Sequence, residues 1–278
     1  MRHHLPDIKT FATLALILQM TGCAVKPGMP DSDIRAKLSN NENTYVKFGN
    51  KPPYIVLQSG FGDGKKVWAA VAEDLQKDQS IFAYDRPGYG SNPASNTPRD
   101  PCTIATELRD QLRSAGLPPP YVLVGHSLGG LYQYVFARLY PSEVAGLVLL
   151  DPTHPQHWPS IQRDVPASAS LIKAMSAVTF STTERREFDA QVTCLDQLDS
   201  AQPLAAPTRL LVSGRLKSIE KGDFEIMLKR LRQDWLRLTK APRVEMIYDA
   251  GHYIQKDSPE EVSAAVREIV IAQTGSRK

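Results

Sequence analysis

Short apolar runs alternate with longer amphipathic stretches along most of this chain. The apolar runs are Tyr54–Gln58, Ile81–Tyr84, Tyr121–Gly125, Val144–Leu150, Arg209–Ser213 and Val244–Tyr248. Helical patterns occupy the intervals Lys65–Gln76, Thr103–Ala115, Leu128–Tyr140, Asp223–Thr239 and Pro259–Ala272. Buried strands that alternate with helices predict an α/β fold, with a mostly parallel sheet covered on both faces. Ligand sites in such sheets lie at the carboxyl ends of the strands.

One interval breaks this alternation. Between Asp151 and Pro207 no central strand is predicted, and several prolines precede helical patterns at Ser168–Ala177 and Thr183–Leu198. We interpret residues 153–206 as a helical lid inserted after one strand, because long insertions are usually functional. The alternative is a surface insertion that has no function.

The chain starts with features of an export signal. Arg2 and Lys9 flank a short apolar stretch, Phe11–Met20, which is too short to span a bilayer. The sequence Met20-Thr21-Gly22-Cys23 resembles a bacterial lipobox, in which the cysteine becomes lipidated. This resemblance implies a signal peptide over residues 1–22 and lipidation at Cys23. The polar residues that follow predict a tether over residues 23–43, and the folded domain then occupies residues 44–278.

The residue after the lipobox cysteine is Ala24 rather than the aspartate that retains lipoproteins at the inner membrane. The resemblance therefore implies an exported protein, lipid-anchored in the outer membrane and facing the periplasm. A periplasmic or secreted protein with an ordinary cleaved signal, or an N-terminal helix with a chance cysteine, is the alternative.

Composition limits the remaining options. The 278 residues are 42% hydrophobic and 23% charged, which suits one soluble core with an insertion. A net charge of +3 gives no basis for nucleic-acid binding. Cys102 and Cys194 form an even pair in an exported protein, which suggests a disulfide; two unpaired cysteines are the alternative. Neither has the spacing of a metal site, and we expect no metal ion.

The best candidate for chemistry is the segment Gly125-His126-Ser127-Leu128-Gly129. It follows an apolar run and opens an amphipathic helix, which is the strand–turn–helix context that a G-x-S-x-G nucleophile elbow requires. Small residues on both sides of Ser127 let neighbouring backbones approach a strained turn. A glycine–serine loop before a core helix is the alternative.

With this motif, the chain from about Tyr45 onward resembles the α/β-hydrolase superfamily. Other segments that carry the resemblance are Gln58–Gly62, Tyr84–Ser91 (Tyr-Asp-Arg-Pro-Gly-Tyr-Gly-Ser) and Ala250–Tyr253. The resemblance implies an α/β-hydrolase fold with Ser127 as the nucleophile. It also implies that Asp85 and Arg86 belong to a structural loop.

A serine hydroxyl needs a base, because it is a weak nucleophile on its own. His252 follows the last apolar run, at the position that the family uses for its base. His154 and His157 stand at the start of the insertion, where they could touch substrate; we interpret them as partly exposed polar residues of the lid.

The third member of the triad is less well defined by the sequence. The loop that often carries the acid, residues 214–219, has no carboxylate. Asp151 directly follows another strand, at a position that some family members use, and we choose it over Glu220 and Asp223. The alternative for Asp151 is a non-catalytic role as a turn residue before Pro152.

An oxyanion hole needs backbone N–H donors. Leu128 follows the nucleophile and supplies one, and the resemblance assigns the other to Phe61. Together these residues predict hydrolysis of a small-molecule carboxylic ester through an acyl-enzyme, without a cofactor.

Several alternatives stay open. On the same fold they are an acyltransferase, an amidase, a lactonase or a cofactor-free haloperoxidase. Outside enzymes they are a non-catalytic binding lipoprotein or a structural envelope protein. Neither the acyl-chain length nor the oligomeric state follows from the sequence.

Overall fold

The computed structural model describes residues 33–40, 42–198 and 202–275. Its centre is one sheet of order β1-β3-β2-β4-β5-β6-β7, in which β1 runs antiparallel to β3 and the other strands are parallel. The strands are β1 (Tyr45–Phe48), β2 (Tyr54–Gln58), β3 (Ser80–Tyr84), β4 (Tyr121–His126), β5 (Val144–Leu150), β6 (Thr208–Ser213) and β7 (Val244–Ile247). The predicted mostly parallel sheet is confirmed.

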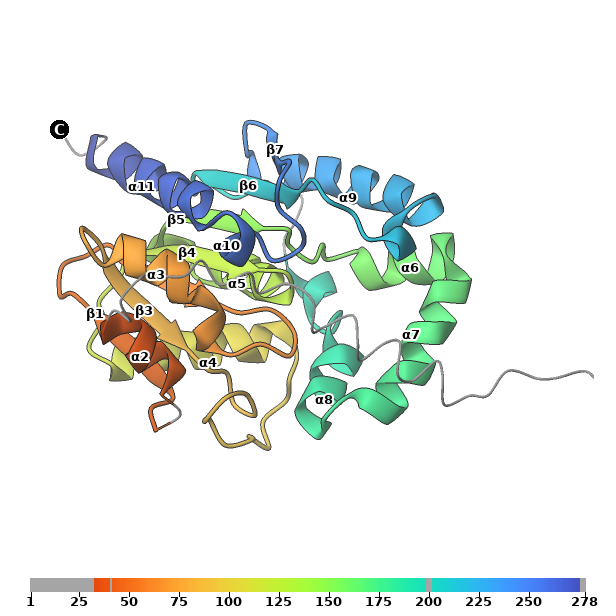
Figure 1. Cartoon of the computed structure of the whole chain (residues 1–278), viewed down its shortest axis with the longest axis horizontal. Coiled ribbons are helices and arrows are strands. Elements are labelled where there is room, and N and C mark those ends of the chain that lie inside the picture. Colours follow the sequence, from red (N-terminus) through yellow and green to blue (C-terminus); the bar gives the residue numbers. More distant parts are fainter. Residues whose placement is uncertain (1–32, 41, 199–201, 276–278) are drawn as a thin grey trace, which may run out of the picture. The chain divides into compact units, whose positions relative to one another are not determined.

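Helices cover both faces of this sheet (Figure 1). One face packs against α4 (Pro101–Ser114), α5 (Leu128–Leu139) and α9 (Asp223–Thr239). The other packs against α2 (Asp33–Ser39), η1 (Lys65–Trp68), α3 (Ala69–Leu75), α10 (Ile254–Asp257) and α11 (Pro259–Gly275). Short 3-10 turns η2 (Pro141–Glu143) and η4 (Ser218–Glu220) complete this part of the chain. Strands β2, β3 and β4 are buried along their whole length, since side chains of both faces enter a core.

The elements outside the predicted pattern include β1 and α2. The edge strand β1 alternates between exposed and buried positions, so that it carries no continuous apolar run. Helix α2 falls within the segment expected to be a tether, residues 23–43. Its Ile34 and Leu38 lie one helical turn apart and are buried against the sheet. Residues 33–39 therefore belong to the folded unit, and the boundary expected at residue 44 is wrong for this part.

The rest of the expected N-terminal segment, including the signal peptide at residues 1–22 and Cys23, lies outside the described residues. Within the part that is described, no helix combines the length and the apolar character that crossing a bilayer needs.

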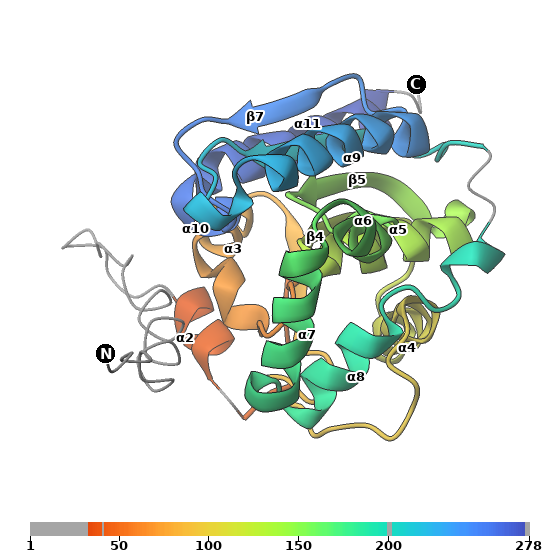
Figure 2. The same cartoon turned by 90° about the vertical axis from the view of Figure 1, so that its right-hand side faces the viewer.

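The interval between β5 and β6 forms an insert of helices. These are α6 (His157–Asp164), α7 (Pro166–Thr179), α8 (Thr182–Ala190) and the short turn η3 (Leu195–Gln197). Helices α6, α7 and α8 lie together to one side of the sheet, and Figure 2 shows α7 and α8 in front of it. Ile161 of α6 packs with Met227 and Leu231 of α9, so the first part of the insert has its own small core.

A disulfide joins the other end of the insert to the sheet domain. Cys102 in the first turn of α4 is bonded to Cys194, 92 residues later and directly before η3. A cross-link across so long a segment restricts the unfolded chain strongly. The bond also keeps the C-terminal end of the insert beside α4.

We expect reduction of this disulfide to lower the free energy of unfolding by about 2–4 kcal/mol, because the unfolded chain gains conformational entropy. Urea unfolding with and without dithiothreitol measures the effect. The matched control is the Cys102→Ser/Cys194→Ser double variant, whose stability should equal that of the reduced protein and not respond to dithiothreitol. A wild-type unfolding curve that reductant leaves unchanged would contradict the expectation.

Candidate active site

Ser127 occupies a strained turn between β4 and α5. Its backbone has φ 52° and ψ −122°, in a region that residues with a side chain rarely adopt. Neighbouring glycines allow this geometry. A Cβ on Gly125 would come within 2.5 Å of the Gly129 carbonyl oxygen, and one on Gly129 within 2.4 Å of the Gln58 carbonyl oxygen. The structure therefore has the tight strand–turn–helix expected of a nucleophile elbow.

His252 and Asp151 meet across the carboxyl ends of the strands. His252 lies in the loop after β7, and Asp151 directly follows β5. His252 Nδ1 lies 2.8 Å from Asp151 Oδ2. Because an ionised carboxylate only accepts hydrogen bonds, this contact assigns the ring proton to Nδ1 and leaves Nε2 as an acceptor. The sheet thus brings together two residues that are 101 positions apart.

Two further side chains hold the Asp151 carboxylate. Ser213 Oγ, at the end of β6, donates to Oδ2 at 2.9 Å. Arg232 Nη2, from α9, donates to Oδ1 at 3.0 Å and to the Ser213 carbonyl oxygen at 3.2 Å. Burial alone would raise the pKa of Asp151, but the hydrogen bonds and charges of His252, Arg232 and Ser213 outweigh it and hold that pKa well below its usual value. Asp151 is therefore ionised at neutral pH.

No sequence pattern pointed to Arg232 or Ser213 as members of this site. Arg232 is one of several cationic residues in an amphipathic helix, and Ser213 ends an apolar strand. Only the fold places both beside Asp151. Ser213 stands at the end of the strand whose following loop lacks the commonly used acid, and it donates to the acid that comes from β5 instead.

The loop that carries His252 is fixed by backbone and side-chain contacts. His126 Nε2 lies 2.8 Å from the His252 carbonyl oxygen. Burial, with a smaller contribution from His252, lowers the pKa of His126 to about 3, so this ring is neutral and donates through Nε2–H. The N–H groups of Gly214 and Arg215 donate to the Ala250 carbonyl at 3.2 and 3.0 Å. His126, the residue before Ser127 in the elbow, therefore positions the loop of the expected base.

The two expected oxyanion donors lie on adjacent segments. Leu128 is the first residue of α5, directly after Ser127. Phe61 follows Gly60 in the loop after β2, and a Cβ added to Gly60 would lie 3.1 Å from the Ser127 Cβ. The Gly60–Phe61 backbone thus passes directly beside the nucleophile. The Phe61 ring contacts Phe180 of the insert, with a centroid separation of 4.8 Å.

The other candidate acids have different surroundings. Glu220 accepts a hydrogen bond from the Lys217 N–H at 2.7 Å and so caps η4, and Asp223 begins α9. Between these residues and Asp151, the geometry favours Asp151 as the partner of His252.

The two histidines of the insert have unequal positions. His154 is buried; its Nδ1 accepts from the Gln156 N–H, and its Nε2 lies 3.1 Å from Asp234. These contacts fit a structural role, but His154 is buried and not partly exposed as expected. For His157, burial and then the charge of His252 lower the pKa to about 4, which indicates a neutral ring near the triad.

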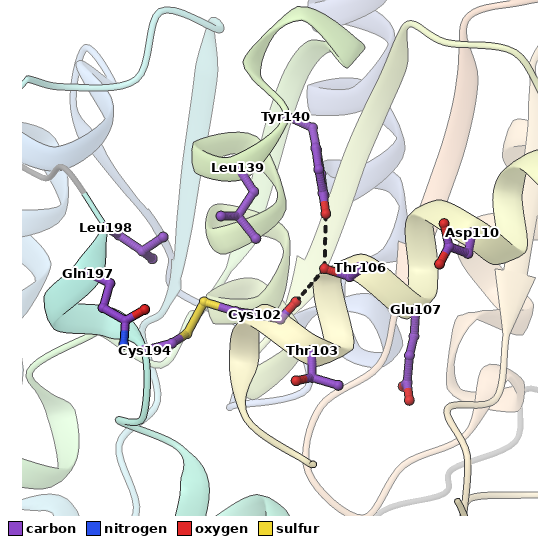
Figure 3. A pocket seen from close by; sticks show the side chains of 10 residues that line it. All are labelled: Cys102, Thr103, Thr106, Glu107, Asp110, Leu139, Tyr140, Cys194, Gln197 and Leu198. Atoms are coloured by element: carbon purple, nitrogen blue, oxygen red, sulfur yellow. Dashed lines mark hydrogen bonds between the residues drawn. A yellow bond between two sulfur atoms is a disulfide. The ribbon is translucent and has the colours of Figure 1, made fainter. Parts of the chain in front are cut away.

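A surface hollow of about 500 Å³ lies elsewhere, around the Cys102–Cys194 disulfide (Figure 3). In it, Thr106 Oγ1 bonds the Cys102 carbonyl and the Tyr140 hydroxyl, each at 2.9 Å. Its lining residues include no member of the expected triad. Asp100 lies beside the two sulfurs, but disulfide-bonded cysteines offer no thiolate to a metal ion.

Comparison with known proteins agrees with this architecture. Residues 53–172 match a family model described as the alpha/beta hydrolase fold. The chain is 30% identical over 128 residues to the (lyso)-N-acylphosphatidylethanolamine lipase of Bos taurus, covering 45% of this chain and 37% of that protein. It is 31% identical over 124 residues to the 1-acylglycerol-3-phosphate O-acyltransferase ABHD5 of Rattus norvegicus, covering 42% and 35%. The matched segments thus span less than half the length of either relative.

A solved structure extends the similarity to most of the described chain. It is a thermophilic esterase from Thermogutta terrifontis, with a TM-score of 0.59, 22% identity, and coverage of 82% of this chain and 93% of that chain. At this identity the likeness concerns the fold alone. The sheet order, the family model over residues 53–172 and this structural match together show that the chain has the α/β-hydrolase fold.

Proposed function

We propose that this protein is a serine hydrolase that cleaves carboxylic esters through an acyl-enzyme intermediate. The observation that carries the proposal is the 2.8 Å contact between His252 Nδ1 and Asp151 Oδ2, at the edge of the sheet where Ser127 occupies a nucleophile elbow. This contact orients an imidazole as a base whose Nε2 can accept a proton. A serine, a largely buried carboxylate and a histidine in this chain order are typical of the fold.

In the proposed reaction, His252 Nε2 takes the proton of Ser127 as Oγ attacks the ester carbonyl. The N–H groups of Leu128 and Phe61 stabilise the negative oxygen of the tetrahedral intermediate. His252 then gives its proton to the leaving alcohol, and the acyl group stays on Ser127. A water molecule, deprotonated by His252, attacks the acyl carbonyl. The bond between Ser127 Oγ and the acyl group then breaks, His252 returns the proton to Oγ, and the carboxylic acid leaves. Asp151 stabilises the positive charge that His252 carries in both steps.

Aromatic side chains beside the site favour an apolar acyl group. The Phe61 ring contacts Phe180, and Phe188 lies within 5.6 Å of Phe180 and 4.8 Å of Trp158, measured between ring centroids. All four are partly exposed and link the oxyanion loop to the insert. An apolar chain bound there would be removed from water. The lipase among the matched relatives acts, by its name, on an acylated phospholipid, which is consistent with such a substrate.

The test is hydrolysis of p-nitrophenyl esters of increasing chain length. We expect Ser127→Ala to lower kcat by at least about 10³-fold, because the covalent step is lost, and Asp151→Asn by about 10³- to 10⁴-fold, because His252 is no longer held in the required tautomer. Circular dichroism confirms that each variant is folded. Adding short alcohols separates hydrolysis from acyl transfer by the products formed. Full activity in Ser127→Ala would exclude the proposal, and full activity in Asp151→Asn would exclude this choice of acid.

The contact of Arg232 with Asp151 leads to a separate expectation. We expect Arg232→Met to lower kcat about 10- to 100-fold with little change in KM, because the carboxylate loses one of the groups that hold it toward His252. Steady-state kinetics on the preferred ester measures this. The control is Lys229→Met, which removes an exposed cation from the same helix, where it pairs with Glu225. Equal activity in both variants would show that Arg232 does not position Asp151.

We also propose that Cys23 is lipidated and holds the enzyme at a membrane facing the periplasm, on the basis of the Met20–Cys23 sequence alone. Expressed in a Gram-negative host, the wild-type protein should sediment with membranes and incorporate labelled palmitate. The Cys23→Ser variant should do neither, since the acceptor thiol is absent. The Cys102→Ser/Cys194→Ser variant controls for general effects of cysteine removal. Label incorporated into Cys23→Ser would contradict the proposal.

A further inference from the structure

Arg86 forms a buried charge cluster between the sheet domain and the insert. It follows β3 and is 2% exposed, while Glu187 of α8 is fully buried. Arg86 Nε and Nη2 donate to the two carboxylate oxygens of Glu187, each at 3.1 Å. The Tyr89 hydroxyl donates to Glu187 Oε2 at 2.8 Å, and Arg99 Nη2 lies 3.7 Å from Oε1. Such a bidentate pair fixes the guanidinium plane.

The same guanidinium also holds the oxyanion loop. Its Nη1 donates to the Ser59 carbonyl oxygen, and its Nη2 donates to the Gly60 carbonyl oxygen at 2.9 Å. Arg86 Cζ further lies 4.6 Å from the centre of the Tyr89 ring and 5.3 Å from that of Tyr132. Besides these rings, the sheet-domain groups that bind Arg86 are the neutral carbonyls of Ser59 and Gly60. The carboxylate that binds it, Glu187, comes from the insert.

The contact with Gly60 acts on the expected oxyanion donor through one peptide group. The Gly60 carbonyl and the Phe61 N–H belong to the same planar unit, in which the C=O and N–H bonds of a trans peptide point in opposite directions. A guanidinium bound to the oxygen therefore fixes the direction of the N–H. It also polarises the amide and makes that N–H a stronger donor. This peptide is the one that passes beside Ser127.

We infer that Arg86 is a positioning residue for the oxyanion hole and that Glu187, carried by the insert, sets its orientation. The inference rests on the proposed ester hydrolysis at Ser127. It assigns the insert a part in transition-state stabilisation, because docking of α8 supplies the carboxylate that holds Arg86 against the Gly60 carbonyl. Glu187 touches no reacting atom and acts only through Arg86.

The experiment is Glu187→Gln, which keeps the shape of the side chain and removes its charge. We expect kcat to fall about 10- to 100-fold with KM changed less than about two-fold, since an oxyanion donor acts only in the transition state. An alkylboronic acid, which forms a tetrahedral adduct on the serine, should bind more weakly by a similar factor. A butyrate product should bind as it does to the wild-type enzyme. If Glu187 had a purely structural role, its substitution would change the affinities for the boronic acid and for butyrate alike.

Asp189→Asn is the matched control, because it makes the same chemical change at an exposed position of α8 that pairs with Lys173. It should leave kcat and boronate affinity unchanged. Tyr89→Phe is the second variant, which removes one hydrogen bond to Glu187, and a several-fold loss of boronate affinity is expected. If Glu187→Gln does not fold, the boronate affinity of Tyr89→Phe tests the inference instead.

Wild-type kcat and boronate affinity in Glu187→Gln, or in Tyr89→Phe where the first variant is unfolded, would overturn the inference. An effect confined to KM would do the same. These outcomes differ from failure of the proposed function, which would appear as ester hydrolysis that persists in Ser127→Ala.

Discussion

The backbone of Ser127 is held where strand β4 turns into helix α5, in a conformation with positive φ. Such a conformation costs about 1–3 kcal/mol, which the packing of the surrounding strands and helices must offset. The turn persists because Gly125 and Gly129 let neighbouring backbones approach to distances that no side chain permits. Every other group of the site is placed relative to this turn, since Leu128 begins the helix and Gly60 packs against Ser127.

The second constraint is an ionised carboxylate in a largely buried place. Asp151 is acceptable there because His252, Ser213 and Arg232 supply hydrogen bonds from three different parts of the chain. An isolated buried charge would instead raise its pKa and become neutral. The donors come from the end of β6, the loop after β7 and α9. The ionised state of Asp151 therefore depends on the assembly of the carboxyl ends of the strands with α9. This explains how a carboxylate that contacts His252 can follow β5, although the loop after β6 carries none.

The insert is joined to the sheet domain by contacts of different kinds. Cys194 is covalently bonded to α4, Glu187 forms a buried ion pair with Arg86, and Ile161 packs with apolar residues of α9. The ion pair constrains the orientation of α8, because separating it would leave two uncompensated charges in a site of low dielectric.

The sequence by itself determined the strands other than β1, most of the helices and the elbow. Period, length and glycine spacing are local properties, and the runs Tyr54–Gln58 and Val144–Leu150 coincide with β2 and β5. It missed β1, which alternates too briefly to stand out, and α2, whose two buried residues are surrounded by polar ones. Only the tertiary structure decided that Asp151 meets His252, that Arg232 and Ser213 join them, and that Glu187 lies against Arg86. These pairs are distant in sequence, and which charges meet depends on how the sheet edge and the helices assemble, which no local pattern records.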